Sequence, residues 1–264
     1  MDLTVLMTWF MGIDIGSAYS KGVIIKDSEL AVCHVIPSGA NYQTAAEVIR
    51  QELLSQANLS QDDITDVAAT GTGAANATFA NHRASEIICS ARGINTVFRQ
   101  VRTAIEVAGQ SSKVIKVNEQ GMVTDFAVSE KCAAGSGRFI EVIANVLRID
   151  LKDFGPLSVK SKQPVNFGTG CAVFGESEAV TRVAEGIPKE DIAAGVNQAL
   201  ASKISSLAKK IKLEEPCAIC GGGALNIGLI KAVEKELHTQ LLVPLQPQII
   251  GALGAAIIAR TSNL

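Results

Sequence analysis

The sequence predicts an α/β protein made of two like halves, and three observations carry this prediction. Residues 105–113 can be laid over residues 13–21 without a gap, so that acid falls on acid and lysine on lysine. Each stretch is followed by an aliphatic strand, a polar turn, another strand and then helices. Each half also has a later strand that runs into glycines, at 70–73 and at 221–223. A repeat of this length is a duplicated unit rather than a short solenoid period.

The composition limits the classes of protein that need to be considered. The 264 residues suffice for one large or two medium domains, and 47% of them are hydrophobic, which supports a substantial core. The net charge of −2 argues against a nucleic-acid or anionic-membrane partner. Residues 1–10 contain no Lys or Arg and are predicted to be an extension rather than a secretory signal. The sequence contains no run of about 18 apolar residues, so no membrane-spanning segment is predicted. We expect a cytoplasmic protein.

In the first half, residues 1–103, the patterns alternate between strands and helices. Strands are predicted over 12–27 with a polar turn, over 30–36, and over 67–70 before a glycine turn. Helices are predicted over 43–57 and over 83–92, where Gly93 ends the second one. The last helix, residues 250–264, is expected to pack back on this half.

In the second half, residues 104–249, helices dominate after the repeated hairpin. A strand is predicted over 122–128 and a polar loop over 152–165, because Gly155-Pro156 is a typical helix breaker. Helices are predicted over 176–185 and from Pro188 to about Lys212, where apolar residues recur at helical spacing.

The repeated hairpins are candidate nucleotide sites. Hairpin turns of small polar residues offer backbone N–H and hydroxyl donors to phosphates, and Asp14 and Glu106 at strand ends could hold Mg²⁺ through water. The alternative is that these are two ordinary hairpins with surface acids and solvated lysines. The doubled pattern favours a nucleotide-binding site. The candidate binding residues are Gly12, Gly16, Ser17, Ser20, Lys21, Gly109, Gly221, Gly222 and Gly223.

A third candidate site begins at Cys132. This cysteine precedes a loop containing Gly135 and Gly137, which leads into an amphipathic helix. A helix N-terminus has unpaired N–H groups and about half a positive charge, and glycines let an anion approach the backbone. The anion could be a phosphate, a metal–sulfur cluster, or both.

Cys171 repeats the pattern, because it also follows glycines and precedes a helix. Buried structural thiols are the commonest fate of free cysteines, and four thiolates shared between two chains could instead hold zinc. Cys217 and Cys220 form a C-x-x-C pair that invites a redox or metal reading. They lie on an apolar strand, however, so a structural role is favoured, as it is for Cys33 and Cys89.

Several of these motifs together resemble a known family. The chain is similar to the ATP-dependent activators of 2-hydroxyacyl-CoA dehydratases, a group that includes the ATPase subunits of benzoyl-CoA reductase and the reductases of double-cubane cluster proteins. The resemblance covers nearly all of residues 12–260. It is carried by the residues Gly12–Ser17, Ser85–Gly93, Lys131–Phe139, Cys171–Glu178, Gly221–Gly223 and Gly251–Ala256.

The resemblance implies a fold, a set of cofactors and a set of partners. It implies the duplicated fold of actin, Hsp70 and sugar kinases, with a nucleotide cleft between the halves. It also implies a homodimer that shares one [4Fe–4S] cluster, for which Cys132 and Cys171 match the ligands. ATP and Mg²⁺ would then drive an electron from ferredoxin or flavodoxin into a partner iron–sulfur enzyme. Asp14, Glu106 and Gln110 match positions that organise the hydrolysis.

One motif departs from the family pattern. The second phosphate loop of the family usually reads Asp-Ile-Gly-Gly-Gln-Asp, whereas this chain has Glu106-Val-Ala-Gly-Gln-Ser111. The altered carboxylates affect the groups that position Mg²⁺ and the attacking water, and therefore the rate or coupling of ATP hydrolysis. They favour a reductase of another cluster protein over a dehydratase activator. Two other functions stay open on the sequence alone: a small-molecule kinase of the same fold, which gives no reason for the loop cysteines, and a nucleotide-switched scaffold without catalysis.

Overall fold

The computed structural model describes residues 8–129, 135–167 and 172–262. The chain divides into two compact units. Unit 1 comprises Met1–Arg99, Gln120–Met122 and Gln248–Leu264, and unit 2 comprises Gln100–Glu119 and Val123–Pro247.

Unit 1 is built on a five-stranded mixed sheet in the order β3-β2-β1-β4-β5. The first three strands pair antiparallel, whereas β4 runs parallel to β1 and β5 runs parallel to β4. The predicted strands are confirmed, except that the first begins earlier, so that part of the expected N-terminal extension is strand. The strands are β1 Trp9–Ile15, β2 Tyr19–Lys26, β3 Glu29–Pro37, β4 Ile64–Thr70 and β5 His82–Arg83.

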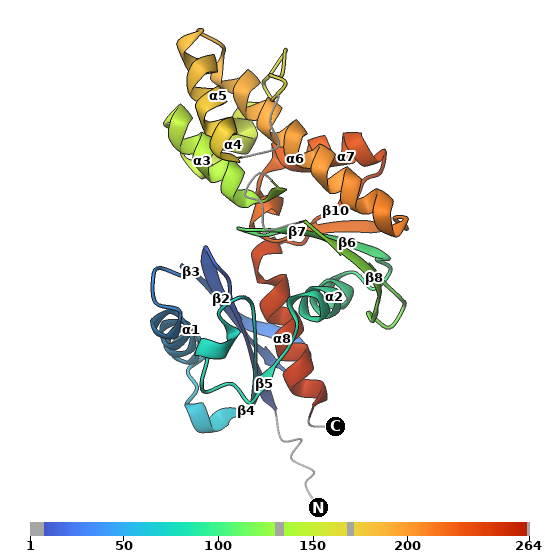
Figure 1. The fold of residues 1–264 in the computed structure, drawn as a ribbon. Helices are drawn as coiled ribbons and strands as arrows, with labels where there is room; N and C mark the ends of the chain where they lie inside the picture. Colours follow the sequence, from blue (N-terminus) through green and yellow to red (C-terminus); the bar gives the residue numbers. More distant parts are fainter. Residues whose placement is uncertain (1–7, 130–134, 168–171, 263–264) are drawn as a thin grey trace, which may run out of the picture. The chain divides into compact units, whose positions relative to one another are not determined.

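Helices cover both faces of this sheet. Successive residues of a strand point to opposite faces, so neighbouring residues of β1 contact different helices. Met11 and Ile13 of β1 pack with Ile49 and other apolar residues of α1 (Tyr42–Ala57). Phe10 belongs instead to the core that contains α2 (Glu86–Val97) and α8 (Ile250–Thr261). The expected packing of a C-terminal helix against the first strands is therefore visible in Figure 1.

Helices α2 and α8 approach each other through glycines. A Cβ at Gly93 would overlap the carbonyl oxygen of Ile250, and a Cβ at Gly254 would overlap that of Cys89. The prediction that Gly93 ends its helix is therefore wrong, since α2 continues to Val97. The glycine is a contact point between helices and not a helix stop.

Unit 2 repeats the topology of unit 1 with the sheet order β10-β9-β6-β7-β8. Strands β6, β7 and β8 pair antiparallel, and β9 and β10 follow in parallel. Each strand of one sheet thus has a counterpart in the other, and the predicted duplication is confirmed. The strands are β6 Thr103–Val107, β7 Ser112–Val117, β8 Val123–Val128, β9 Cys217–Cys220 and β10 Leu241–Leu242.

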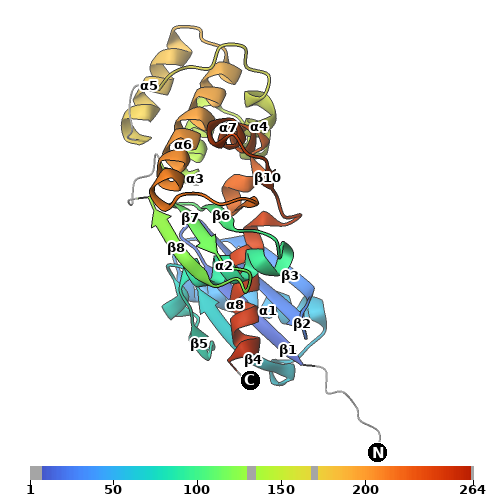
Figure 2. The ribbon, with the colours of Figure 1, turned by 90° about the vertical axis from the view of Figure 1, so that its right-hand side faces the viewer.

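The helices of unit 2 share one apolar core with one face of its sheet. The long helix α6 packs against both α7 and α4, as Figures 1 and 2 show. Among the described residues, no helix is both long enough and apolar enough to cross a membrane. The helices are α3 Gly137–Leu147, α4 Leu151–Ser158, α5 Ala172–Ala184, α6 Lys189–Ile211 and α7 Ile227–Leu237.

The expected polar loop over 152–165 is wrong in its first part, because α4 occupies Leu151–Ser158 with Pro156 inside it. A proline inside a helix removes one backbone hydrogen bond and crowds the carbonyl four residues before it. Gly155 has a packing reason, since a Cβ there would lie 2.7 Å from Asn226 Oδ1 and 3.0 Å from the backbone nitrogen of Ile227. Buried contacts with α6 and α7 outweigh the weak local propensity.

Candidate functional site

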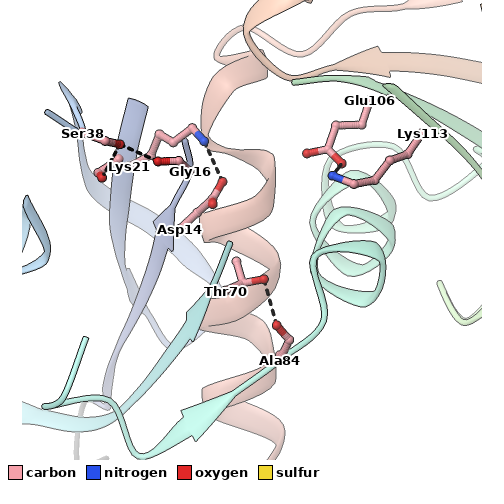
Figure 3. Close-up of polar contacts among 9 residues, drawn as sticks. Asp14, Gly16, Lys21, Ser38, Thr70, Ala84, Glu106 and Lys113 are labelled. Carbon is pink, nitrogen blue, oxygen red and sulfur yellow. Dashed lines mark hydrogen bonds and ion pairs between the residues drawn. The ribbon is translucent and has the colours of Figure 1, made fainter. Parts of the chain in front are cut away.

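The first hairpin, β1–β2 with its turn at residues 16–18, carries a lysine–carboxylate pair. Asp14 and Lys21 are opposite each other in the antiparallel register, and Lys21 Nζ lies 2.8 Å from Asp14 Oδ2. Both side chains are mostly buried, with 16% of Lys21 and 11% of Asp14 exposed. Figure 3 shows the lysine reaching along the hairpin to the carboxylate. The pair puts one positive and one negative group at the end of the same hairpin.

Two glycines leave space around the Asp14 carboxylate. A Cβ at Gly71, which has a φ of +90°, would lie 2.5 Å from Asp14 Oδ1. A Cβ at Gly251, at the start of α8, would lie 2.9 Å from Asp14 Oδ2. Both glycines occur in motifs noted in the sequence, but neither was predicted as a site residue. Their adjacency to Asp14 could be found only from the fold, because they lie 57 and 237 residues further along the chain.

The end of β4 is fixed directly before the first of these glycines. The hydroxyl of Thr70, which is 1% exposed, donates a 2.9 Å hydrogen bond to the carbonyl of Ala84 (Figure 3). This bond joins the strand end to the segment that leads into α2.

Other predicted residues of the first hairpin have structural partners. Gly16 closes the turn by donating from its N–H to Tyr19 O, and its own carbonyl accepts from Ser38 Oγ at 2.6 Å (Figure 3). Ser20 is fully buried with its Oγ 2.8 Å from Ser38 Oγ, and Ser17 lies partly exposed in the turn. Ser38 was missed in the sequence because nothing in its neighbourhood repeats a known phosphate motif.

The absence of a side chain at Gly12 is explained by helix packing and not by contact with a ligand. A Cβ at this position would overlap the carbonyl oxygen of Ala252 and the backbone nitrogen of Ala256. Gly12 therefore lets α8 lie directly on β1. Its predicted contact with a cofactor has no support from this geometry.

The second hairpin, β6–β7 with its turn at residues 108–111, repeats the charged pair. Glu106 and Lys113 are opposite each other in the register, and Lys113 Nζ lies 2.8 Å from Glu106 Oε2 (Figure 3). The turn is closed by a 2.9 Å hydrogen bond from Ala108 N–H to Ser111 O. Gly109 is partly exposed and Gln110 is exposed in this turn. The longer Glu side chain thus makes the same lysine pair that Asp14 makes.

The glycine turns after β4 and β9 also match. Gly71 has a φ of +90° and a Cβ there would meet Ile15 O, while Gly221 has a φ of +82° and a Cβ there would meet Val107 O. Both positions need the left-handed backbone that glycine adopts readily. Gly223 packs on the Val107 side chain, and Gly222 opens the short 3₁₀ turn η4 (Gly222–Leu225). The second half therefore supplies the counterpart of each element around Asp14, except for α8.

The start of α3 differs from its prediction. The N–H groups of Gly137 and Arg138 donate to Ala108 O at 2.9 Å and to Gly109 O at 3.0 Å. The N–H of Phe139 donates to Ser136 O at 3.2 Å. The expectation that the first N–H groups of this helix are unpaired is therefore wrong for these three residues. The hairpin carbonyls accept from the first two of them, so the helix start is bound to the second hairpin.

Cys132 and Cys171 lie outside the described residues. The described part of the chain contains no group of three or more His, Cys, Asp or Glu side chains that could hold a metal ion. Phe139, in the first turn of α3, contacts both sides of the segment that contains Cys171. Its ring makes an edge-on contact with Phe167 at 5.8 Å between centroids, and a Cβ at Gly175 in α5 would lie 2.7 Å from Phe139 Cε2.

Cys217 and Cys220 are buried and unbonded to each other. Burial, together with the nearby Glu215, raises the pKa of the Cys217 thiol to about 12. Burial and the Glu106 carboxylate raise the pKa of the Cys220 thiol well above its ordinary value. Since thiolates are the reactive and metal-binding form, both thiols are protonated near neutral pH, and the structural reading of this C-x-x-C pair is supported.

A duplicated α/β unit, with a charged hairpin and a glycine turn in each half, defines a protein of the actin and sugar-kinase fold. Solved structures agree: a glucokinase from Streptomyces griseus covers 96% of this chain with a TM-score of 0.60, although only 12% of residues are identical. At that identity the likeness establishes the fold alone.

The chain belongs to the BadF/BadG/BcrA/BcrD ATPase family, whose model matches residues 11–259. It is 38% identical to a 2-hydroxyisocaproyl-CoA dehydratase activator from Clostridioides difficile over 94% of both chains. It is 36% identical to the (R)-2-hydroxyglutaryl-CoA dehydratase activating ATPase of Acidaminococcus fermentans over 94% of this chain and 96% of that one. A solved structure of the Clostridium difficile activator with bound ADPNP covers 97% of this chain and 95% of its own, with 37% identity and a TM-score of 0.92.

Proposed function

We propose that this protein is an ATP-driven electron-transfer component that delivers a low-potential electron to a partner iron–sulfur enzyme. Its relatives include activators of two different acyl-CoA dehydratases at 38% and 36% identity. This similarity supports a 2-hydroxyacyl-CoA dehydratase as the partner class, in preference to the other cluster proteins that the altered second phosphate loop suggested. The acyl group stays open, because the two relatives act with different enzymes at nearly equal similarity.

The nucleotide part of the proposal assigns both hairpins to ATP. Lys21 and Lys113 supply positive charge to phosphate oxygens, as charge-assisted hydrogen bonds do. Asp14 and Glu106 hold Mg²⁺ through water, which suits an oxygen-ligated ion with a preference for hydration. Gly71 and Gly251 support this assignment, because the lack of side chains there leaves room beside the Asp14 carboxylate. Gln110, exposed in the second turn, is the candidate for orienting water.

The cluster part of the proposal assigns Cys132 and Cys171 as ligands of a [4Fe–4S] cluster. The observation that carries it is the position of Phe139, which packs between Phe167 and Gly175 on either side of the segment with Cys171. Phe139 follows Cys132 by seven residues, so a described residue close after one cysteine contacts described residues on both sides of the other. A bound cluster would supply one-electron chemistry at low potential.

Two cysteines per chain imply a second copy of the protein. A cubane cluster takes four thiolates, and the described residues offer no alternative set of ligands. We therefore propose a homodimer with one shared cluster, reduced by ferredoxin or flavodoxin. A shared zinc ion would use the same four thiolates but would carry no electron.

The test is anaerobic purification followed by metal analysis and visible absorbance. We expect about four iron atoms per dimer. Cys132→Ala and Cys171→Ala should each abolish the absorbance while ATP still binds, and Cys33→Ala, at a partly buried position in β3, should leave it intact. Absorbance that survives in both ligand variants refutes the cluster assignment, and zinc in place of iron refutes the electron-transfer function.

A further inference from the structure

The two hairpins differ in what their buried serines hold. Ser20 and Ser112 occupy equivalent positions at the start of the second hairpin strand, and both are at most 1% exposed. Ser38 and Ser129 each directly follow the third strand of their sheet, but at different register positions. Ser20 is opposite Ile36, whereas Lys113 is opposite Val128, so Ser129 corresponds to Ile36 and Ser38 lies two residues further along. Each half therefore brings a second serine near its buried hairpin serine in its own way.

In unit 1 the pair closes the hairpin on itself. The two hydroxyls of Ser20 and Ser38 lie 2.8 Å apart, and Ser38 donates onward to Gly16 O in the same hairpin. The next helix, α1, has a cap of its own, since the Asn41 side chain accepts from the N–H of Thr44. None of these bonds joins the hairpin turn to the first turn of α1.

In unit 2 the two serines, Ser112 and Ser129, make different hydrogen bonds. Ser129 Oγ accepts from the backbone N–H of Ser112 at 2.9 Å, so the Ser112 hydroxyl is directed elsewhere. It donates to the carbonyl of Gly135 at 2.7 Å, two residues before α3 begins. A Cβ at Gly135 would lie only 3.4 Å from Ser129 Cβ, so Gly135 lies directly on this serine.

The hairpin carbonyls complete the connection. Ser136 makes no side-chain cap for α3, and the N–H groups of Gly137 and Arg138 donate to the carbonyls of Ala108 and Gly109 in the turn. Leaving a buried donor or acceptor unpaired costs about 1–3 kcal/mol. The start of α3 and the turn are therefore expected to move together, because separating them would break both hydrogen bonds. The second hairpin thus serves as the N-terminal cap of α3.

We propose that Ser112 is a positioning residue that couples nucleotide binding at the second hairpin to the start of α3. The inference rests on the proposed function, because it needs a nucleotide at that hairpin. When the turn moves to follow the phosphates, the bond from Ser112 to Gly135 O carries Gly135 and the first turn of α3 with it. Ser112 touches no nucleotide in this scheme, and its equivalent Ser20 has no such effect on α3.

The test is hydrogen–deuterium exchange of peptides covering residues 135–147, with Mg²⁺ and either ADP or ADPNP. We expect the wild-type protein to exchange about ten-fold differently in the two nucleotides at Gly137 and Arg138, which corresponds to about 1.4 kcal/mol. Ser112→Ala should raise the exchange and make it equal in both nucleotides, with the affinity for nucleotide kept. Ser112→Thr, which keeps the hydroxyl, should retain the difference, and so should the control Ser206→Ala, which removes an exposed hydroxyl of α6 that donates to Ser202 O.

The outcomes separate the two proposals. A nucleotide-dependent difference that survives in Ser112→Ala overturns the coupling role, and so does a wild-type protein that binds nucleotide without any change at α3. A wild-type protein that binds no nucleotide overturns the proposed function as well. If Ser112→Ala does not fold, Ser129→Ala replaces it, since this variant removes the acceptor that fixes Ser112, and the same loss is expected.

Discussion

At the scale of single residues, the most informative feature is a lysine–carboxylate pair that occurs twice. Lys21 pairs with Asp14 and Lys113 pairs with Glu106, each at 2.8 Å and each across an antiparallel register position. The sequence repeat predicted that the acids and lysines were equivalent, but not that they contact each other. Glu106 is one methylene longer than Asp14 and still makes the pair. The change of acid therefore preserves the charge arrangement of this hairpin.

We expect the lysines to contribute to nucleotide affinity. Lys21→Met and Lys113→Met should each weaken the binding of Mg²⁺–ADPNP about ten-fold or more, because a charge-assisted hydrogen bond is worth about 1.5–3 kcal/mol. Isothermal titration calorimetry measures the effect. Lys231→Met, at an exposed position of α7, is the matched control and should leave the affinity unchanged. Unchanged affinity in both hairpin variants would contradict the assignment of these hairpins to phosphates.

At the scale of helices and strands, the sequence predicted most of the fold because the apolar periodicity was strong. The β1–β2 hairpin, α1 and α6 were expected from their patterns and are present near the expected bounds. The errors fall at Gly93 and at Gly155-Pro156, where residues that locally favour a break lie inside helices. In both places another element approaches so closely that only glycine fits. Such contacts depend on distant parts of the chain and are invisible in a local pattern.

The candidate site was predictable to a similar extent. The charged hairpins and the glycine turn Gly221–Gly223 were recognised because they repeat in the sequence. Gly71 and Gly251 beside Asp14, and Ser38 behind Gly16, were missed because only the folded sheet brings them there. The pairing of the α3 N–H groups with the turn of the second hairpin was likewise unpredictable, since residues 108 and 137 lie far apart in sequence.

The α2–α8 contact should be intolerant of added volume. A Cβ at Gly254 would overlap the backbone carbonyl of Cys89, which cannot move away without shifting α2. Gly254→Ala should therefore lower the free energy of unfolding by about 3 kcal/mol or more. Gly186→Ala is the control, because Gly186 has a φ of +78° with open space around it and should cost only about 1 kcal/mol of backbone strain. Urea unfolding measures both, and equal losses would contradict the packing argument.

Asp191, in the first turn of α6, should make stability depend on pH. The pKa of this buried carboxyl is lowered by the Ser161 hydroxyl, which donates to it, and by the N–H groups of Gln163 and Lys162. A lowered pKa means that Asp191 stabilises the fold above its ordinary pKa of 3.8, and that this contribution is lost as the pH falls through the folded value.

Asp191→Ala should accordingly destabilise the protein near neutral pH, and its deficit should shrink below about pH 4. Urea unfolding at several pH values measures the deficit. Asp62→Ala is a suitable control, because this exposed carboxylate makes no hydrogen bond within the described part of the chain. A deficit for Asp191→Ala that is independent of pH would show that the charged hydrogen bonds are not its cause.

At the scale of the whole molecule, duplication has produced two units with the same topology and different attachments. The first hairpin is closed on itself by Ser20 and Ser38, whereas the second caps α3 and holds Gly135. This asymmetry fits the proposal that the second half passes on the nucleotide state.

The last prediction concerns the coupling of ATP to electron transfer. We expect the reduced protein to reduce the cluster of a 2-hydroxyacyl-CoA dehydratase in the presence of Mg²⁺ and ATP, and not with ADP or ADPNP, because an uphill transfer needs the free energy of hydrolysis. Anaerobic absorbance of the acceptor after mixing measures the transfer. Cys132→Ala should bind ATP and transfer nothing. Equal transfer with ADPNP would refute the energetic coupling, whereas ATP turnover without reduction of any cluster partner would favour the nucleotide-switched scaffold.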